Sequence, residues 1–175
     1  TVLQNRQLGT AHAVECADRF VTKNNTDTIV LFGDVPLIQN STIRNLKRYK
    51  NRVKSVGAIV TFTTSSPFGY GRVVTDKQYV EDIIEEGDTN LEQKKIKLCN
   101  SGILICDSKY LFSSLKKIKN DNNQKERFLT DICRLAYEQG NPFTFFNCHE
   151  NEVLGINSRE QLVEMDNKFQ NTYKS

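Results

Sequence analysis

The chain has 175 residues and a mass of 20.1 kDa, with 38% hydrophobic residues, 26% charged residues and a mean hydropathy of −0.52. These values exclude a disordered tail and a membrane protein, and they predict one soluble globular domain. The net charge is only +3, which indicates neither a nucleic-acid nor a membrane partner. Five scattered cysteines without a C-x-x-C pair, and an N-terminus without a signal-peptide pattern, favour a cytoplasmic location.

The first part of the chain alternates helix and strand. Apolar residues at helical spacing predict helices, and short β-branched apolar runs predict strands that are buried on both faces. In chain order the predictions are a helix over 11–21 capped by Thr10, a strand over 28–32, a helix over 41–49 and a strand over 58–63. Strand, helix and strand in this order predict a βαβ unit.

The second part begins with a predicted hairpin, followed by a return to mixed elements. The predictions are hairpin strands over 72–75 and 79–84, a strand over 98–106, a helix over 109–115, an exposed loop over 119–127, a helix over 130–139, strands over 143–147 and 152–154, and a last helix that begins at Ser158. Together the elements predict an α/β fold with a Rossmann-like, mostly parallel sheet and a β-hairpin insert.

Several polar or glycine-containing turns lie where an α/β sheet binds ligands. Asp34 follows Gly33 just after a buried strand, which is a ligand position in open sheets. Gly9 and Thr10 stand at a helix start, where backbone N–H groups favour an anion or a base edge. The other candidates are Gly71, Glu85, Asn100 and Asn157. Taken singly, each pattern is explained at least as well by a helix cap, a turn or a β-bulge.

The same segments, taken in order, carry a family resemblance. They are Gln-Leu-Gly-Thr-Ala-His-Ala from residue 7, Gly-Asp-Val-Pro-Leu-Ile from 33, Gly-Tyr-Gly-Arg from 69, Ile-Ile-Glu-Glu from 83, Asn-Ser-Gly-Ile from 100, Leu-Thr-Asp-Ile from 129 and Gly-Ile-Asn-Ser-Arg from 155. This series resembles the uridylyltransferase domain of the bifunctional N-acetylglucosamine-1-phosphate uridylyltransferase / glucosamine-1-phosphate acetyltransferase. The whole chain, residues 1–175, then corresponds to part of that domain.

The resemblance implies a reaction and a set of site residues. It implies transfer of a uridylyl group from UTP to N-acetylglucosamine 1-phosphate with Mg²⁺, giving UDP-N-acetylglucosamine for cell-envelope and peptidoglycan precursors. It places Asp34 and Asn157 as the ligands of Mg²⁺, and we expect these two side chains to approach each other. The remaining positions are Gln4, Gly9 and Thr10 at the uracil, and Gly71, Glu85 and Asn100 around the amino sugar and its ribose neighbour. Gly33 is also assigned to substrate binding.

The chain also departs from the family pattern. The family's first strand and its glycine-rich phosphate loop have no counterpart before Gln4, and the acetyltransferase domain that forms its homotrimer has none after the last helix. Gly87 stands where a Lys is common, and Lys125 and Arg127 are further departures. Two alternatives therefore stay open, namely another sugar-nucleotide pyrophosphorylase and a non-catalytic remnant of the fold.

Two expectations follow from the missing front segment. As given, the chain should be a poor catalyst, because it would lack the glycine loop and cationic groups that orient a triphosphate. It should also leave two neighbouring strands with unpaired backbone edges, so we expect either a gap in the sheet or strand pairing with another chain.

Overall fold

The computed structural model describes residues 1–155 and residue 163. The helices are α1 (Thr10–Glu15), α2 (Asn40–Val53), α3 (Ser108–Leu115) and α4 (Asp131–Glu138). The strands are β1 (Asp27–Val30), β2 (Gly57–Thr63), β3 (Arg72–Asp76), β4 (Tyr79–Ile84), β5 (Leu98–Asp107) and β6 (Phe143–Asn147). Asn157 and the last predicted helix lie outside the described residues.

The six described strands form one sheet in the order β1-β5-β2-β6-β4-β3, with an additional pairing between β5 and β3. The α/β class and the β3–β4 hairpin are confirmed. The sheet is mixed, however, and not mostly parallel: within the described part, β2 and β6 form the one parallel pair. The reason is that β5 runs antiparallel between β1 and β2, so the two strands of the predicted βαβ unit are parallel without being neighbours.

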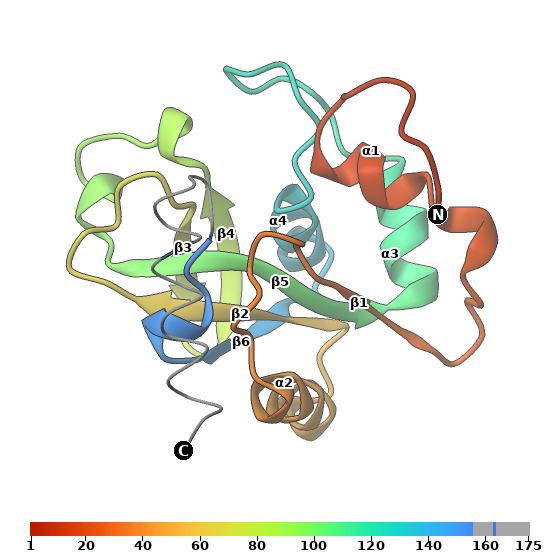
Figure 1. The fold of residues 1–175 in the computed structure, drawn as a ribbon, viewed down its shortest axis with the longest axis horizontal. Coiled ribbons are helices and arrows are strands. Elements are labelled where there is room, and N and C mark those ends of the chain that lie inside the picture. Colours follow the sequence, from red (N-terminus) through yellow and green to blue (C-terminus); the bar gives the residue numbers. More distant parts are fainter. Residues whose placement is uncertain (156–162, 164–175) are drawn as a thin grey trace.

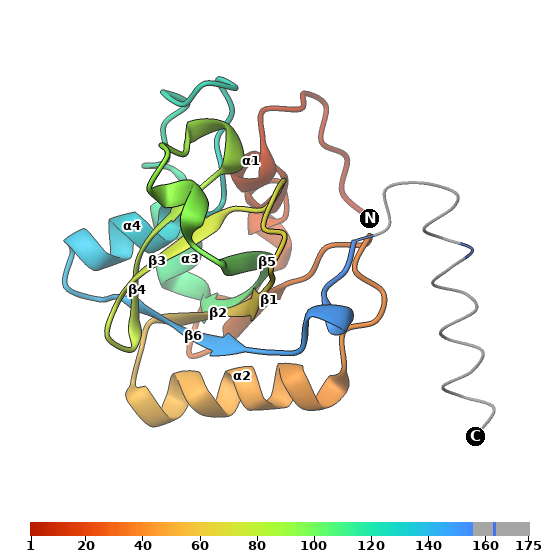
Figure 2. The ribbon, with the colours of Figure 1, turned by 90° about the vertical axis from the view of Figure 1, so that its left-hand side faces the viewer.

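Helices cover both faces of this sheet (Figures 1 and 2). Among the described helices, α2 is the one on the first face, where its buried Leu46 packs in a cluster with Val60, Phe62 and Ile105 of the sheet. Helices α1, α3 and α4 lie on the other face and supply Ala11, Leu111, Ile132 and other residues to a second cluster. Because β2 faces both clusters, its apolar residues are buried on both sides, as predicted from its unbroken apolar run.

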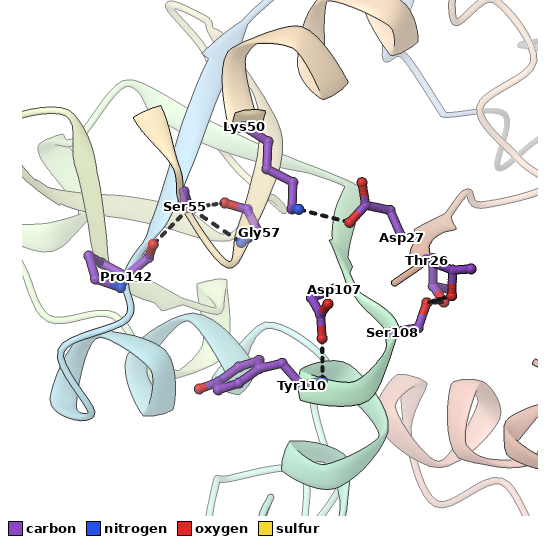
Figure 3. Close-up of polar contacts among 10 residues, drawn as sticks. Thr26, Asp27, Lys50, Ser55, Gly57, Asp107, Ser108, Tyr110 and Pro142 are labelled. Atoms are coloured by element: carbon purple, nitrogen blue, oxygen red, sulfur yellow. Dashed lines mark hydrogen bonds and ion pairs between the residues drawn. The ribbon is translucent and has the colours of Figure 1, made fainter. Parts of the chain in front are cut away.

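Polar contacts fix the end of the sheet where β1 and β2 begin (Figure 3). The Lys50 ammonium of α2 lies 2.7 Å from the Asp27 carboxylate of β1, and both side chains are largely buried. At the end of β5, the Asp107 carboxylate accepts a hydrogen bond from the Tyr110 N–H at 2.8 Å and thereby caps α3. These contacts attach α2 and α3 to the sheet at the end away from Asp34.

Two predicted elements are wrong in extent or type. The first helix ends at Glu15 and a separate 3-10 turn follows over Asp18–Phe20. Phe20 is 62% exposed, so the apolar spacing that predicted a longer helix does not correspond to a buried face. The predicted strand over 152–154 is also absent, because Glu150–Glu152 form a 3-10 turn and only Val153 of the three predicted residues is buried.

Strand β1 is the described edge of the sheet. It pairs with β5 on one side, and no other described strand pairs with it. Ile29 and Leu31, in and just after this strand, are 39% and 51% exposed. The described strands form one sheet without an internal gap, so the gap expected between two neighbouring strands is not found, and pairing with another chain stays a prediction.

Candidate functional site

A hollow of about 340 Å³ brings together five of the predicted site residues. They are Thr10, Asp34, Gly71, Glu85 and Asn100, which come from five separate segments of the chain. A second hollow of about 250 Å³ also has Asp34 in its wall and extends to Gly155. The fold thus brings residues that are distant in sequence together on one concave surface, which is the common form of a small-molecule site. Their individual roles stay predictions.

Glu85 is held inside this hollow by β4 and by the start of α4. It follows the last residue of β4, and its Oε1 accepts a hydrogen bond of 2.8 Å from the Thr130 hydroxyl. Burial raises the pKa of Glu85, the hydrogen bond from Thr130 lowers it, and the charge of Asp88 raises it further. Because Thr130 occupies Oε1, Oε2 is the oxygen of Glu85 that can accept a hydrogen bond from a ligand hydroxyl.

Gly71 makes room for the Glu85 carboxylate. A Cβ at position 71 would lie 3.2 Å from Glu85 Oε2 and 3.1 Å from the Ile83 side chain, so a larger residue would push Glu85 aside. The Gly71 carbonyl also accepts a hydrogen bond of 2.9 Å from the Asn100 N–H. The three residues Gly71, Glu85 and Asn100 therefore form one packed unit.

Asn100 lies in a β-bulge, as the sequence predicted. The register of β2 and β5 shifts between Ile59 and Thr61, opposite the segment from Asn100 to Leu104. Within it, Asn100 Oδ1 accepts a hydrogen bond of 3.1 Å from the Gly102 N–H. This bond orients the side-chain amide so that its Nδ2 is the group that can donate to a ligand.

The turn before α1 contains the three residues assigned to the uracil. Gln4 Nε2 donates a hydrogen bond of 3.3 Å to the Gly9 carbonyl and lies 3.0 Å from His12 Nδ1. Gly9 has φ 102° and ψ 174°, and a Cβ there would lie 2.7 Å from the Arg127 backbone nitrogen and closer still to its carbonyl oxygen. Glycine is therefore needed at position 9 because of the Arg127 backbone, and the place of the uracil beside this turn stays a prediction.

Thr10 connects the same turn to the segment before α4. Its Oγ1 accepts a hydrogen bond of 2.9 Å from the Leu129 N–H. On either side of it, the Arg127 N–H donates to Leu8 and the Ala11 N–H donates to Arg127, at 2.9 and 3.0 Å. The Thr10 hydroxyl keeps its proton as a donor toward the hollow.

Asp34 is the candidate metal ligand among the described residues. It is exposed, it lines both hollows, and its carboxylate makes no hydrogen bond or ion pair within residues 1–155. No group of three or more His, Cys, Asp or Glu side chains in the described part of the chain could hold a metal ion. One carboxylate fits Mg²⁺ nevertheless, because this ion takes one or two carboxylates together with waters and substrate phosphates. Asn157, its predicted partner, lies outside the described residues, and Gly33 lines neither hollow.

Other lining residues were not assigned from the sequence. Among them are Phe32, Tyr70, Gln124 and Thr130. Tyr70 packs edge-on against Phe62 at 4.8 Å, and burial raises its pKa, with smaller contributions from Glu150 and Cys99. Thr130 stands in the Leu-Thr-Asp motif and could have been noticed there, whereas Gln124 lies in a polar loop with no distinguishing pattern.

A hollow at one end of a mixed α/β sheet, with an exposed carboxylate after β1, is typical of proteins that bind nucleotides and phosphorylated sugars. Comparison with known proteins defines the class: residues 1–165 match the nucleotidyl transferase family. The chain therefore belongs to that family.

Two curated relatives show which members of this family the chain is similar to in sequence. The chain is 41% identical, over 166 residues, to a protein of Acanthamoeba polyphaga mimivirus named probable UDP-N-acetylglucosamine pyrophosphorylase, covering 92% of the chain and 65% of that relative. It is also 41% identical over 166 residues to the bifunctional protein GlmU of Fervidobacterium nodosum, covering 95% of the chain and 36% of that relative. The resemblance found in the sequence motifs is confirmed. The chain spans about two thirds of the first relative and about a third of the second.

Solved structures with low sequence identity share the fold. A UDP-glucose pyrophosphorylase complexed with UDP-glucose superposes with a TM-score of 0.70 at 17% identity, over 97% of this chain and 64% of that one. A putative glucose-1-phosphate thymidylyltransferase from Bacillus anthracis gives 0.67 at 19% identity, over 94% and 62%. Separately, none of the described helices is both long and apolar enough to cross a membrane.

Proposed function

We propose that the natural protein transfers a uridylyl group from UTP to N-acetylglucosamine 1-phosphate and releases pyrophosphate. The observation that carries this proposal is the gathering of Thr10, Asp34, Gly71, Glu85 and Asn100 around one hollow, in a chain 41% identical to a probable UDP-N-acetylglucosamine pyrophosphorylase. The product would be an activated amino sugar for cell-envelope and peptidoglycan precursors, and its soluble substrates favour the cytoplasm.

The chain's own groups would bind and orient the two substrates. Glu85 Oε2 would accept a hydrogen bond from a sugar hydroxyl, and Asn100 Nδ2 would donate one to the sugar or ribose. Gln4, Gly9 and Thr10 would hold the uracil. A phosphate oxygen of the sugar phosphate then attacks the α-phosphorus in line, the bond from that phosphorus to the bridging oxygen of the β-phosphate breaks, and pyrophosphate leaves.

Asp34 and Asn157 would hold Mg²⁺ in this proposal. The ion would neutralise charge on the triphosphate when bound. The exposed, unpaired Asp34 carboxylate beside both hollows supports the first of these assignments. Because positioning and charge neutralisation suffice for such a displacement, no covalent nucleophile is needed from the chain.

The test is pyrophosphate release by the natural protein with each pairing of UTP or TTP with N-acetylglucosamine 1-phosphate or glucose 1-phosphate. We expect the UTP and N-acetylglucosamine 1-phosphate pair to give the highest kcat/KM. Asp34→Ala should abolish turnover, while Glu92→Ala, at an exposed carboxylate of an exposed ion pair, should leave it unchanged. Preference for another pair would indicate a different sugar-nucleotide pyrophosphorylase, and no release with any pair would indicate a non-catalytic protein.

A further inference from the structure

An ion pair between a buried guanidinium and a partly exposed carboxylate lies next to the candidate site without lining it. Arg72, the first residue of β3, is 2% exposed, and its Nη2 donates to Glu86 Oε2 at 2.6 Å. Its Nη1 donates to the Tyr70 carbonyl, and its Nε is buried without a partner among the described residues. Burial of an unpaired guanidinium would lower the stability of the protein, so the Glu86 carboxylate is needed beside Arg72 to neutralise it.

Glu86 also binds the turn of Gly69–Gly71, whose Tyr70 carbonyl accepts the bond from Arg72. Its Oε2 also accepts a hydrogen bond of 3.3 Å from the Gly69 N–H. Burial alone would raise the pKa of Glu86, but the hydrogen bond and the charge of Arg72, with the Gly69 N–H, lower it. The charged pair thus holds the turn from Gly69 to Gly71 at two backbone points, the Gly69 N–H and the Tyr70 carbonyl.

The pair also separates two consecutive carboxylates. Glu85 has extended backbone angles, φ −64° and ψ 150°, so the side chains of Glu85 and Glu86 leave the chain in different directions. Glu86 contacts Arg72, while Glu85 contacts Thr130 inside the hollow. Arg72 begins β3 and Glu86 lies two residues after the end of β4, and these two hairpin strands lie side by side in Figure 2.

We propose that Arg72 and Glu86 are positioning residues, whose ion pair fixes the turn of Gly69–Gly71 and directs Glu85 into the sugar-phosphate part of the site. Neither side chain touches substrate. The inference rests on the proposed function for its kinetic consequence. The uracil side should be unaffected, because the turn around Gly9 and Thr10 is attached to Arg127 and Leu129 and not to β3.

The first variant is Glu86→Gln in the natural protein, with Glu92→Gln at an exposed ion pair as the matched control. We expect the KM for N-acetylglucosamine 1-phosphate to rise roughly ten-fold or more, from the loss of charge-assisted hydrogen bonds, while the KM for UTP changes less than about two-fold. Equal increases in both KM values, or no increase in either, would overturn the proposal.

A double variant separates positioning from simple stability. Arg72→Met with Glu86→Leu removes both charges together, so that no buried charge is left without a partner. We expect thermal stability near that of the natural protein but a sugar-phosphate KM as high as in Glu86→Gln. Recovery of the natural KM in this double variant would show that the pair has no positioning role.

Hydrogen exchange tests the same inference without any substrate. In Glu86→Gln the Gly69 amide should exchange roughly ten-fold faster or more, because it loses a charged acceptor, while the Ala11 amide should be unchanged. An unchanged Gly69 amide would overturn the positioning role whatever the enzyme's substrates are. If instead the natural protein releases no pyrophosphate from UTP and N-acetylglucosamine 1-phosphate, the proposed function fails by itself.

Discussion

Substitution of Gly9 by alanine should release the turn before α1 from the rest of the site. Gly9 has φ 102° and ψ 174°, a combination almost confined to glycine, and an alanine held there would cost roughly 1–3 kcal/mol. Its Cβ would also meet the Arg127 backbone, with 2.7 Å to the nitrogen. The backbone around position 9 therefore has to move, whatever the side chains do.

The loss of stability is limited by the hydrogen bonds that attach this turn to the rest of the protein. Three hydrogen bonds attach it to the segment before α4: Arg127 N–H to Leu8, Ala11 N–H to Arg127, and Leu129 N–H to Thr10. At about 0.5–1.5 kcal/mol each, complete detachment would cost roughly 2–4 kcal/mol. Because the contact with the Arg127 backbone prevents an alanine from keeping the native conformation, detachment sets the loss, and we expect Gly9→Ala to lower the free energy of unfolding by about 2–4 kcal/mol.

Urea unfolding of this chain measures that change, with Gly140→Ala as the control. Gly140 also has a positive φ, 72°, but nothing lies within 4 Å of a Cβ there, so its substitution should cost only about 1 kcal/mol. Hydrogen exchange should be faster at the Ala11 and Arg127 amides in Gly9→Ala alone. If Gly9→Ala costs no more than Gly140→Ala, the packing of Arg127 against Gly9 does not have the importance assigned to it.

Three further predictions concern carboxylates and one lysine. Glu85→Gln should raise the KM for the sugar phosphate by roughly 10- to 100-fold and leave the KM for UTP unchanged, since one charged acceptor is lost; steady-state kinetics checks both values. Burial raises the pKa of Asp131 to about 6, an effect that Arg134 opposes and Asp82 reinforces, so this group makes the free energy of unfolding fall as pH rises from about 4 to about 6. Urea unfolding of the natural chain and of Asp131→Asn between pH 4 and 7 should show that the variant lacks this fall, so that the difference between their free energies of unfolding changes by about 1–2 kcal/mol over the range. A difference that stays constant with pH would contradict the raised pKa. Lys50→Met should lower the free energy of unfolding by roughly 2–4 kcal/mol, because Asp27 is left without its partner at 2.7 Å; a melting temperature equal to that of the natural chain would count against this.

The sequence predicts the elements of this fold better than their arrangement. Strand β2 is found near its predicted range because a strand buried on both faces gives an unbroken apolar run, and helix α2 because a helix buried on one face gives apolar residues at helical spacing. Apolar spacing does not indicate which strands are neighbours in the sheet. The insertion of β5 between β1 and β2 depends on contacts between residues 35 to 80 positions apart, and so the mixed sheet was predicted as mostly parallel.

In the candidate site too, local sequence indicates some residues, while others are placed only by tertiary contacts. Asp34, Glu85 and Asn100 could be proposed because each is a polar residue at the end of a strand or within a bulge, where local sequence gives a signal. Gln124 could not, because it lies in an irregular polar loop that reaches the hollow only through tertiary contacts. Asn123 in that loop donates hydrogen bonds to Asp88 and Gly87, at 3.3 and 3.0 Å.

The segment from Arg127 to Thr130 explains why residues so far apart in sequence form one hollow. Arg127 and Leu129 bind the turn around Gly9 and Thr10 through backbone groups, and the last residue, Thr130, binds Glu85 through its hydroxyl. The predicted uracil side and the predicted sugar side are therefore both attached to the four residues just before α4. Displacement of this segment would move both sides together, whereas loss of the Arg72–Glu86 pair would move only the sugar side. Comparison of the two KM values in variants of each kind separates these two structural supports of the site.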